Sequence, residues 1–152
     1  MRKKIYNRKD VIEHLINLKR EEIKGLEESY KIYAESADLD EDSSLELDDF
    51  AQQTLSTESA RNLQLRIDAE REKLNQFINL RPELVNEITE GNVVLTDKVN
   101  FVIGMAFKDF EWEGKRFVGI STKAPIFEAL VGKRAGDQVQ FHDIVYNIEQ
   151  IL

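Results

Sequence analysis

One short segment separates two long stretches of helical sequence and so determines the fold. It reads Asp38-Leu39-Asp40-Glu41-Asp42-Ser43-Ser44-Leu45-Glu46. The first 80 residues contain no Pro and no Gly except Gly25, so helix-breaking residues are nearly absent on both sides. Ser43 and Glu46 have the spacing of a capping box, in which a Ser caps the start of a helix and a Glu three residues later reaches back. The sequence therefore predicts a turn in this segment and a second helix after it.

Apolar residues recur every three or four positions on both sides of the segment, as in a helix that buries one face against a partner helix. The residues before it are Ile12, Ile16, Ile23, Leu26, Tyr30, Tyr33 and Ala37, and those after it are Ala60, Leu63, Ile67, Leu74 and Phe77. Lys19 interrupts the first series and Glu70 interrupts the second. Two such series joined by one turn predict an antiparallel helical hairpin over residues 1–80.

Folding the chain at residue 41 or 42 places apolar residues opposite one another along most of the hairpin. Ile16 then faces Ile67, and Ile23 faces Ala60. We expect the first helix to run over residues 8–37, which gives an arm of about 45 Å at about 1.5 Å per residue. Because the two apolar series satisfy each other, little apolar surface is left for another chain, and we expect a monomer.

The sequence changes character after Leu80. Both Pro residues and six of the seven Gly residues lie in 81–152, and hydrophobic residues now alternate with polar ones, as in strands. The alternating positions are Val99, Phe101, Ile103, Val139, Phe141, Ile144, Tyr146 and Ile148, and a further strand fits residues 116–121. Pro125 and Gly132 bracket one short helix. The predicted fold class is α+β, with a helical hairpin followed by a small antiparallel sheet domain carrying one helix.

Composition excludes several classes of protein. The 152 residues carry a net charge of -8, contain two His and lack Cys, which excludes disulfides, thiolate metal sites and cysteine nucleophiles. The chain has no apolar run long enough to span a bilayer and no signal peptide at its start, so we expect a cytoplasmic protein without a membrane partner. The acidic balance argues against autonomous binding to nucleic acid, because phosphate affinity comes mainly from Lys and Arg.

The turn is strongly acidic. Eight acids and no base lie between Glu35 and Asp49. An EF-hand does not fit, because Leu45 and Leu47 interrupt the ligand pattern and the required Gly is absent. Partial coordination of Mg²⁺ does fit, because that ion often takes one or two protein carboxylates and fills its other positions with water and phosphate oxygens. A solvated turn without a ligand is the alternative.

Two stretches resemble the bacterial Gre transcript cleavage factors, GreA and GreB, and the resemblance covers nearly the whole chain. The first is the acidic turn, which aligns with the family's hairpin tip. The second is the more specific, because eight residues fall in step with the family motif: Pro125, Ala129, Leu130, Gly132, Lys133, Gly136, Asp137 and Val139.

The resemblance implies a function in transcription elongation. The second domain, 81–152, would be FKBP-like and serve docking, through Ala124, Pro125, Lys133 and Arg134. The hairpin would enter the secondary channel of bacterial RNA polymerase, where Asp38 and Glu41 help hold a catalytic Mg²⁺ shared with the polymerase, with Asp40 and Asp42 as further candidate ligands. The polymerase would then cleave backtracked RNA near its 3′ end. The chain itself would have no nuclease activity.

Three alternatives stay open at this point. At the tip, Ala37 replaces the family's Gly, Asp42 its Asn, and Ser44-Leu45 its Glu-Tyr. Retention of Asp38 and Glu41 favours cleavage, whereas Asp40, Asp42 and the missing Tyr favour a channel-binding regulator that does not support cleavage. An FKBP-like prolyl isomerase or chaperone would use an apolar peptide pocket formed by the aromatic residues Phe101, Phe107, Phe110, Trp112, Phe117, Phe141 and Tyr146. A dimerising coiled coil is the third.

Overall fold

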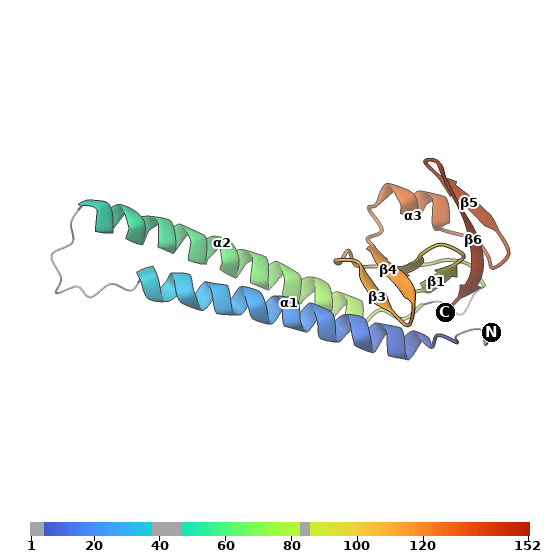
Figure 1. Ribbon diagram of the computed structural model, residues 1–152, viewed down its shortest axis with the longest axis horizontal. Coiled ribbons are helices and arrows are strands. Elements are labelled where there is room, and N and C mark those ends of the chain that lie inside the picture. The colour runs from blue at the N-terminus through green and yellow to red at the C-terminus, as the bar shows by residue number, and fades with distance from the viewer. Residues whose placement is uncertain (1–4, 38–46, 83–85) are drawn as a thin grey trace. The chain divides into compact units, whose positions relative to one another are not determined.

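A computed structural model (Figure 1) describes residues 5–37, 47–82 and 86–152, and the side chains of all of these except 37 and 47–53. The chain divides into two compact units, one of Ile16–Leu74 and the other of Met1–Leu15 together with Asn75–Leu152. Two long helices precede a six-stranded sheet and one short helix, so the predicted α+β class is confirmed. The predicted capping box of Ser43 and Glu46 lies outside the described residues.

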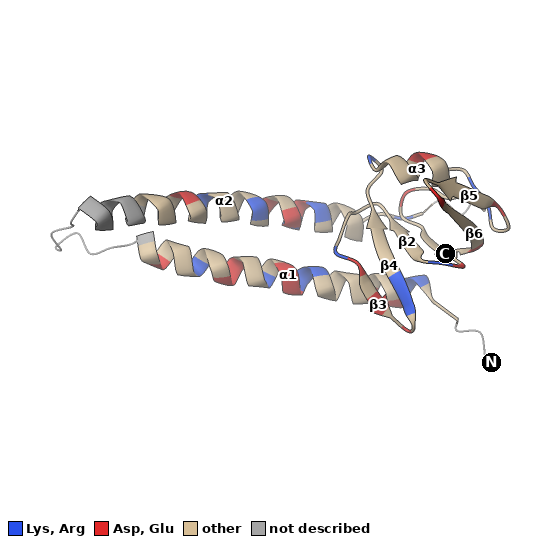
Figure 2. Ribbon diagram, turned by 45° about the horizontal axis from the view of Figure 1, so that its top comes forward, with Lys and Arg blue, Asp and Glu red and all other residues tan. Residues whose placement is uncertain are grey.

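The unit Ile16–Leu74 consists of two antiparallel helices, as Figures 1 and 2 show. Helix α1 spans Arg8–Ala37, the bounds predicted from the sequence, and α2 spans Leu47–Ile78. The scarcity of Gly and the absence of Pro allow both helices to continue without a break. No helix in the described ranges is both long enough and apolar enough to cross a bilayer.

The faces of α1 and α2 that meet are apolar, and five of the predicted contact positions are buried. They are Ile23, Ala60, Ile67, Leu74 and Phe77, each less than 9% exposed. Ile12 and Ile16 are only half-buried, because Val11 and Leu15 occupy the buried positions at the start of α1. Tyr33, which the spacing places on the same face, is instead 42% exposed. Among the described side chains of α1, the last buried apolar residue is therefore Ile23.

The two interruptions of the apolar series, Lys19 and Glu70, pair with each other. The ammonium Nζ of Lys19 lies 2.6 Å from Oε2 of Glu70, and their side chains are only 4% and 15% exposed. The predicted register, which pairs Ile16 with Ile67, places Lys19 opposite Gln64 instead. The observed partner lies six residues nearer the C-terminus. The helices are thus offset from the prediction in the direction that brings the two charges together.

The sheet of the other unit has the strand order β3-β4-β2-β1-β6-β5. Its strands are β1 (Val93–Thr96), β2 (Asn100–Ile103), β3 (Phe110–Trp112), β4 (Lys115–Ile120), β5 (Gln138–Phe141) and β6 (Ile144–Ile151). Neighbouring strands are antiparallel except β2 and β4, which run parallel from Asn100 beside Phe117 to Ile103 beside Ile120. The prediction of a wholly antiparallel sheet is wrong for this pair, because the chain crosses over through β3 before it returns as β4.

Strands β1 and β3 were not predicted, for different reasons. All four residues of β1 are buried, so its sequence lacks the alternation that reveals a half-exposed strand. Strand β3 is only three residues long and ends in a tight turn at Glu113 and Gly114, both with positive φ. Short edge strands of this kind carry little periodic signal.

The core of this unit lies between the sheet and α3 (Pro125–Leu130). Its buried residues are Ile88, Val94, Phe101, Ile103, Ile120, Leu130, Val139, Tyr146 and Ile148. Leu130 is fully buried and joins α3 to this cluster, while Ile126 and Phe127 pack against it. The helix thereby fixes the position of the residues before and after it, which include the four predicted docking residues.

Aromatic rings attach the first residues of the chain to β3 and β4 within the same unit. His14 stacks on Trp112, with ring centroids 5.3 Å apart and planes 12° apart, and Tyr6 meets Phe117 edge-on at 5.6 Å. Phe110 stacks in turn on Phe117 at 5.3 Å. Contacts of this geometry stabilise beyond the area they bury. They hold the N-terminal residues in place beside the sheet.

Candidate functional site

The predicted catalytic and metal-binding residues occupy the connection between α1 and α2. Helix α1 ends at Ala37 and α2 begins at Leu47, so Asp38, Asp40, Glu41 and Asp42 all belong to the segment that joins them. These four residues lie outside the described part of the chain. Elsewhere, among the residues that are described, no group of three or more His, Cys, Asp or Glu side chains could hold a metal ion.

Apolar side chains are exposed on the helices that flank the acidic segment. Ile32 in α1 and Leu55 in α2 are each 64% exposed, and Tyr33 is 42% exposed. Single exposed apolar residues are common on protein surfaces. Tyr33 was predicted to lie on the buried face, whereas Ile32 and Leu55 fall outside the apolar period of three and four.

The first two predicted docking residues form the start of α3. Ala124 is the N-cap residue, with an extended backbone at φ -70° and ψ 138°, and Pro125 occupies the first turn. The carbonyl of Ala124 accepts a hydrogen bond from the amide of Phe127 at 3.0 Å. Ala124 has no side-chain oxygen with which to cap the helix, so the helix starts by backbone contacts alone.

The chain leaves α3 through a turn at Gly132, whose φ of 79° is in the left-handed region that favours glycine. The amide of Gly132 donates to the carbonyl of Ile88 at 3.0 Å, and the amide of Ile88 donates to the carbonyl of Lys133 at 2.8 Å. This reciprocal pair ties the residues after α3 to the segment that precedes β1. The backbone of Lys133 is therefore structural, while its side chain is exposed.

A second turn follows directly and positions Arg134. The carboxylate of Asp137 accepts a hydrogen bond from the amide of Arg134 at 2.8 Å, and Gly136, at φ 94°, donates to the carbonyl of Ile148 at 2.7 Å. Only Gly adopts such a φ without strain. Gly132, Gly136 and Asp137, three of the residues that match the family motif, thus shape the backbone that presents Lys133 and Arg134.

The two basic side chains differ in their surroundings. Nη2 of Arg134 donates to the Glu87 carboxylate at 2.6 Å, and this hydrogen bond raises the pKa of Arg134 above its ordinary value. Lys133 makes no ion pair with any residue in the described ranges. Glu87 was not predicted as a partner of Arg134, because it lies 47 positions away and only the fold brings the two side chains together.

The structure places the four predicted docking residues at the two ends of α3. Ala124 and Pro125 begin the helix, and Lys133 and Arg134 follow it, separated by a helix of six residues and about 9 Å. Val131, the C-cap residue, is 45% exposed beside them. Val131 was predicted to belong to the helix, but α3 ends at Leu130 and Val131 is a surface residue.

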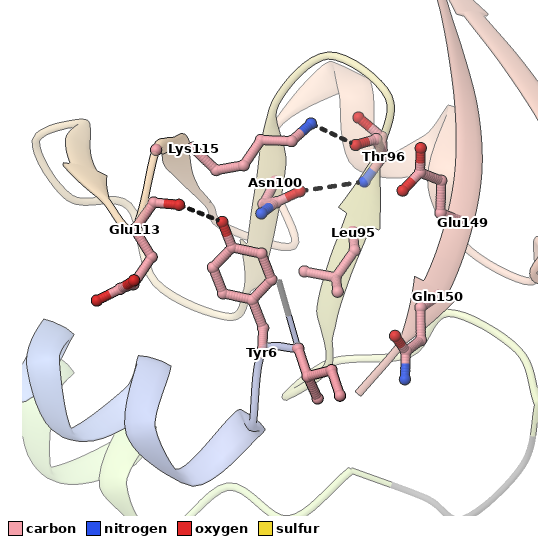
Figure 3. Close-up of a pocket in the computed structure, with 10 residues that line it drawn as sticks. Tyr6, Leu95, Thr96, Asn100, Glu113, Lys115, Glu149 and Gln150 are labelled. Atoms are coloured by element: carbon pink, nitrogen blue, oxygen red, sulfur yellow. Dashed lines mark hydrogen bonds between the residues drawn. The ribbon is translucent and has the colours of Figure 1, made fainter. Parts of the chain in front are cut away.

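The aromatic residues proposed for an isomerase pocket pack against one another instead. Phe107, Phe110, Trp112 and Phe117 form one cluster of rings, and Phe101 meets Tyr146 edge-on at 5.2 Å in the core. The same unit contains a pocket of about 580 Å³ (Figure 3), but none of the seven aromatic residues proposed for the isomerase lines it. Its walls are Ile5, Tyr6, Leu95, Thr96, Asn100, Glu113, Gly114, Lys115, Glu149 and Gln150.

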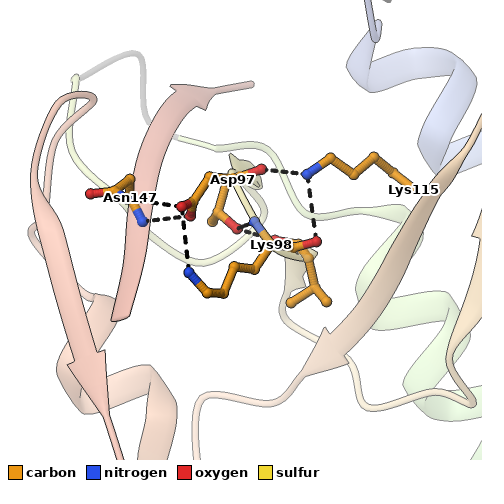
Figure 4. A network of polar contacts seen from close by, with 6 residues as sticks. Asp97, Lys98, Lys115 and Asn147 are labelled. Carbon is orange, nitrogen blue, oxygen red and sulfur yellow. Dashed lines mark hydrogen bonds and ion pairs between the residues drawn. The ribbon is translucent and has the colours of Figure 1, made fainter. Parts of the chain in front are cut away.

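A network of polar contacts lies next to this pocket (Figure 4). The carboxylate of Asp97 accepts two hydrogen bonds from Asn147, one from the backbone amide and one from the side-chain amide, both at 2.8 Å. These bonds lower the pKa of Asp97 to about 2. Nζ of Lys115 donates to the carbonyl of Thr96 at 2.7 Å, which fixes the turn between β1 and β2 from its other side.

Comparison with known proteins gives likenesses among solved structures only. No protein-family model and no curated protein matches the chain. A crystal structure of GreA factor homolog 1 (Gfh1) from Thermus thermophilus is 17% identical, with 94% of this chain and 93% of that chain covered and a TM-score of 0.35. A structure of the transcription factor Gfh1 is 19% identical, with 93% of this chain and 91% of that chain covered and a TM-score of 0.34. The crystal structure of Thermus aquaticus Gfh1 is 20% identical over 93% and 92%, with a TM-score of 0.33. TM-scores below 0.5 do not support an inference of function, so the function has to be argued from the residues of this chain.

Proposed function

We propose that this chain is a transcription elongation factor that acts on bacterial RNA polymerase. Its acidic segment 38–46 enters the secondary channel of the polymerase and stimulates Mg²⁺-dependent cleavage of backtracked RNA. The chain has no nuclease activity of its own, and the catalytic site is completed only in the complex. The resemblance to the Gre factors in the acidic segment and in residues 121–139 is the origin of this proposal.

The observation that carries the proposal is the position of the acidic segment between two long helices. Helix α1 has 30 residues, which corresponds to about 45 Å, and α2 has 32. The apolar contact between them and the buried pair of Lys19 with Glu70 stiffen this hairpin. A stiff hairpin can carry a cluster of carboxylates into a narrow channel, whereas an isolated acidic loop has no such reach.

The chemistry of the acidic segment suits Mg²⁺. All of its candidate ligands are carboxylates, and Mg²⁺ prefers oxygen ligands while retaining water and phosphate oxygens in its other positions. In this proposal Asp38 and Glu41 each supply a carboxylate ligand to the Mg²⁺ ion, and Asp40 and Asp42 are further candidate ligands. A second metal ion in a polymerase site activates water and stabilises the charge that develops during phosphodiester hydrolysis. The acids also disfavour direct binding of RNA by the free chain.

Residues at the two ends of α3 are the proposed docking surface. Lys133 is the stronger candidate of the two bases, because its side chain is exposed and no described residue neutralises it, whereas Arg134 is already paired with Glu87. An exposed ammonium attracts an acidic partner surface, and the attraction extends further at low ionic strength. The partner surface for this region is therefore an acidic one.

Binding and cleavage can be separated by substitution. Asp38→Asn and Glu41→Gln each remove one charge and keep the shape of the side chain, so polymerase binding should persist while cleavage falls by orders of magnitude. Raising the Mg²⁺ concentration should partly restore cleavage, because mass action compensates for weaker affinity. Asp48→Asn is the matched control and should leave cleavage unchanged. Equal losses in all three variants would contradict the assigned roles.

The docking surface is tested by reversing the charge of Lys133. Lys133→Glu should weaken binding to the polymerase in a titration, and the loss should be larger at low salt. Lys108→Glu is a suitable control, because Lys108 is also an exposed base of the same unit and lies far along the chain from α3. If both variants bind as the wild type does, the ends of α3 do not dock.

A channel-binding regulator that does not support cleavage is the second candidate. The observation that favours it is the composition of the tip, where Asp40 and Asp42 add charge and no Tyr is present. Such a protein would bind the polymerase, compete with cleavage and leave backtracked RNA intact. The two candidates predict opposite results in one cleavage assay.

A further inference from the structure

A pocket beside β1 and β2 is not used by the proposed function. It lies within the unit formed by Met1–Leu15 and Asn75–Leu152, and its volume of about 580 Å³ is typical of sites for small molecules. Five of its residues, Leu95, Thr96, Asn100, Glu149 and Gln150, come from the adjacent strands β1, β2 and β6, and Ile5 and Tyr6 also line it. The residues at the ends of α3 contribute nothing to it.

Asn100 is the feature of this pocket that points to a ligand. Its side chain is fully buried, and its Oδ1 accepts a hydrogen bond from the amide of Thr96 at 3.2 Å. Because Thr96 offers a donor, the oxygen must face it, and the amide nitrogen Nδ2 lies on the opposite side, toward Tyr6 and Glu113 (Figure 3). Nδ2 has no hydrogen-bond partner among the described residues. A buried donor without an acceptor is costly, and an acceptor supplied by a ligand would remove that cost.

The walls around Asn100 are held in place before any ligand arrives. The hydroxyl of Tyr6 donates to the carbonyl of Glu113 at 2.9 Å, and its ring rests edge-on against Phe117. The ammonium of Lys115 is engaged by the carbonyl of Thr96 at 2.7 Å, so its aliphatic stem is fixed along the pocket. Together with Leu95 these groups form an apolar wall that suits a flat molecule.

Charge narrows the class of ligand. Glu149 and Gln150 line the pocket with an exposed carboxylate and an amide, and the Lys115 ammonium is already bonded to backbone. An anionic ligand would meet the repulsion of Glu149 without a free cation to offset it. A ligand with an amino group opposite Glu149 would gain a charge-assisted hydrogen bond.

We propose that this pocket binds a small, uncharged, flat heterocycle that presents a carbonyl or ring-nitrogen acceptor to Asn100 and an amino donor to Glu149, the chemical class to which nucleobases belong. The ring lies against Tyr6 and Leu95. Binding is independent of the polymerase, so the pocket and the proposed function can succeed or fail separately.

Titration of the full-length ¹⁵N-labelled chain with cytidine tests the proposal. The side-chain amide of Asn100 and the backbone amides of Leu95 and Thr96 should shift and saturate, with a Kd of about 1 mM, as expected for a ligand of this size in a preformed pocket. Benzoate, which is flat but anionic, should cause no saturable shift. Saturation by benzoate but not by cytidine would overturn the assignment of ligand class.

Two variants test the contacts. Asn100→Asp keeps the acceptor for the Thr96 amide but removes the free donor, and it should raise the Kd at least about tenfold. Glu149→Gln changes an exposed side chain and should raise the Kd about threefold. Glu128→Gln, an exposed Glu on α3, should bind as the wild type does. Two results would overturn the proposal. One is the absence of any saturable shift when the wild type is titrated with cytidine, and the other is a wild-type Kd for cytidine in both Asn100→Asp and Glu149→Gln.

Discussion

At the scale of single residues, Ala124 leaves a helix end incompletely satisfied. Its backbone has the extended conformation of an N-cap, but its methyl group offers no acceptor to the free amides of the first turn of α3. A hydroxyl at this position would accept a hydrogen bond from an amide two or three residues later.

Ala124→Ser should therefore stabilise the unit that contains α3 by about 0.5–1 kcal/mol. Chemical denaturation followed by the fluorescence of the single Trp, Trp112, measures the change. Ala135→Ser is the control, because Ala135 is exposed in a turn outside α3 and should change stability by less than about 0.5 kcal/mol. A destabilised Ala124→Ser variant would show that the cap geometry is not available to a side chain.

Asp97 joins two segments that lie 50 positions apart in the sequence. Its two hydrogen bonds from Asn147 favour the charged form and hold its pKa at about 2, below the ordinary value of 3.8. A carboxylate with a lowered pKa in the folded state stabilises the fold above its ordinary pKa. This contribution is lost as the pH falls through the interval from 3.8 to about 2.

Asp97→Asn should remove this part of the pH dependence. Wild type and variant should differ in their free energies of unfolding at pH 5 to 7, and the difference should shrink as the pH falls from about 4 to about 2, because protonated Asp97 resembles the amide. Urea denaturation at a series of pH values makes the comparison. Asp143→Asn, at an exposed position of the same unit, should follow the wild type throughout. A difference that stays constant with pH would show that the charge of Asp97 is not the cause.

At the scale of elements, the hairpin places one ion pair on an otherwise apolar contact. Burial raises the pKa of Glu70, but its close contact with the Lys19 ammonium outweighs burial, so that the pKa is below its ordinary value. Buried ion pairs contribute little net stability, because desolvation offsets the attraction, but a single charged pair can select one register of two helices. We infer that Lys19 and Glu70 select the observed register over the one that pairs Ile16 with Ile67.

Lys19→Met should destabilise the hairpin by about 3 kcal/mol, because it leaves the Glu70 carboxylate without its partner. The double variant Lys19→Leu with Glu70→Leu should recover most of this stability. Arg71→Ala is the matched control, because its ion pair with Glu27 is about half exposed and should contribute less than about 0.5 kcal/mol. Thermal unfolding followed by circular dichroism measures all four proteins.

The register itself can be measured with spin labels, because the chain has no native Cys. Labels introduced through Glu28→Cys and Asn62→Cys, both at exposed positions, should give a single distance in the wild-type background. In the double Leu variant a second population should appear, displaced along the helix axis by about 10 Å, the length of one heptad. If the double variant keeps one unchanged distance, apolar packing alone selects the register.

The elements differ in how far their sequences predict them. The 30 residues of α1 can be predicted from the absence of helix-breaking residues and from the spacing of Ile residues. The register of the hairpin cannot, because Lys19 and Glu70 were treated as gaps in the two apolar series and not as partners of each other. Strand β1 escapes prediction because both of its faces are buried. The parallel pairing of β2 with β4 depends on contacts between distant segments that no local period records.

The docking residues were predicted from a motif, and the structure divides their roles. Gly132, Gly136 and Asp137 shape two turns, which explains their types physically, and Lys133 is left as the exposed base without a described partner. Glu87 could not be found from the sequence, because only the fold brings it to Arg134. The roles of Asp38 and Glu41 stay predictions, since both residues lie outside the described part of the chain.

At the scale of the whole molecule, the negative charge is concentrated in one segment that contains no Lys or Arg. Of the 29 acidic residues, eight fall between Glu35 and Asp49, and the net charge of the chain is -8. Such a cluster costs stability through repulsion unless a cation or a basic partner relieves it. The proposed function supplies that relief in the polymerase channel, through an ion shared with the polymerase.

The most direct test of the central claim is a transcript cleavage assay on backtracked elongation complexes, in which wild-type chain, Asp38→Asn and no factor are compared at several Mg²⁺ concentrations. The wild type should accelerate shortening of the RNA from its 3′ end by orders of magnitude, and Asp38→Asn should bind the same complexes with little acceleration that grows as Mg²⁺ is raised. If the wild-type chain binds the complexes and the RNA stays intact at every Mg²⁺ concentration, stimulation of cleavage is contradicted and the channel-blocking regulator takes its place.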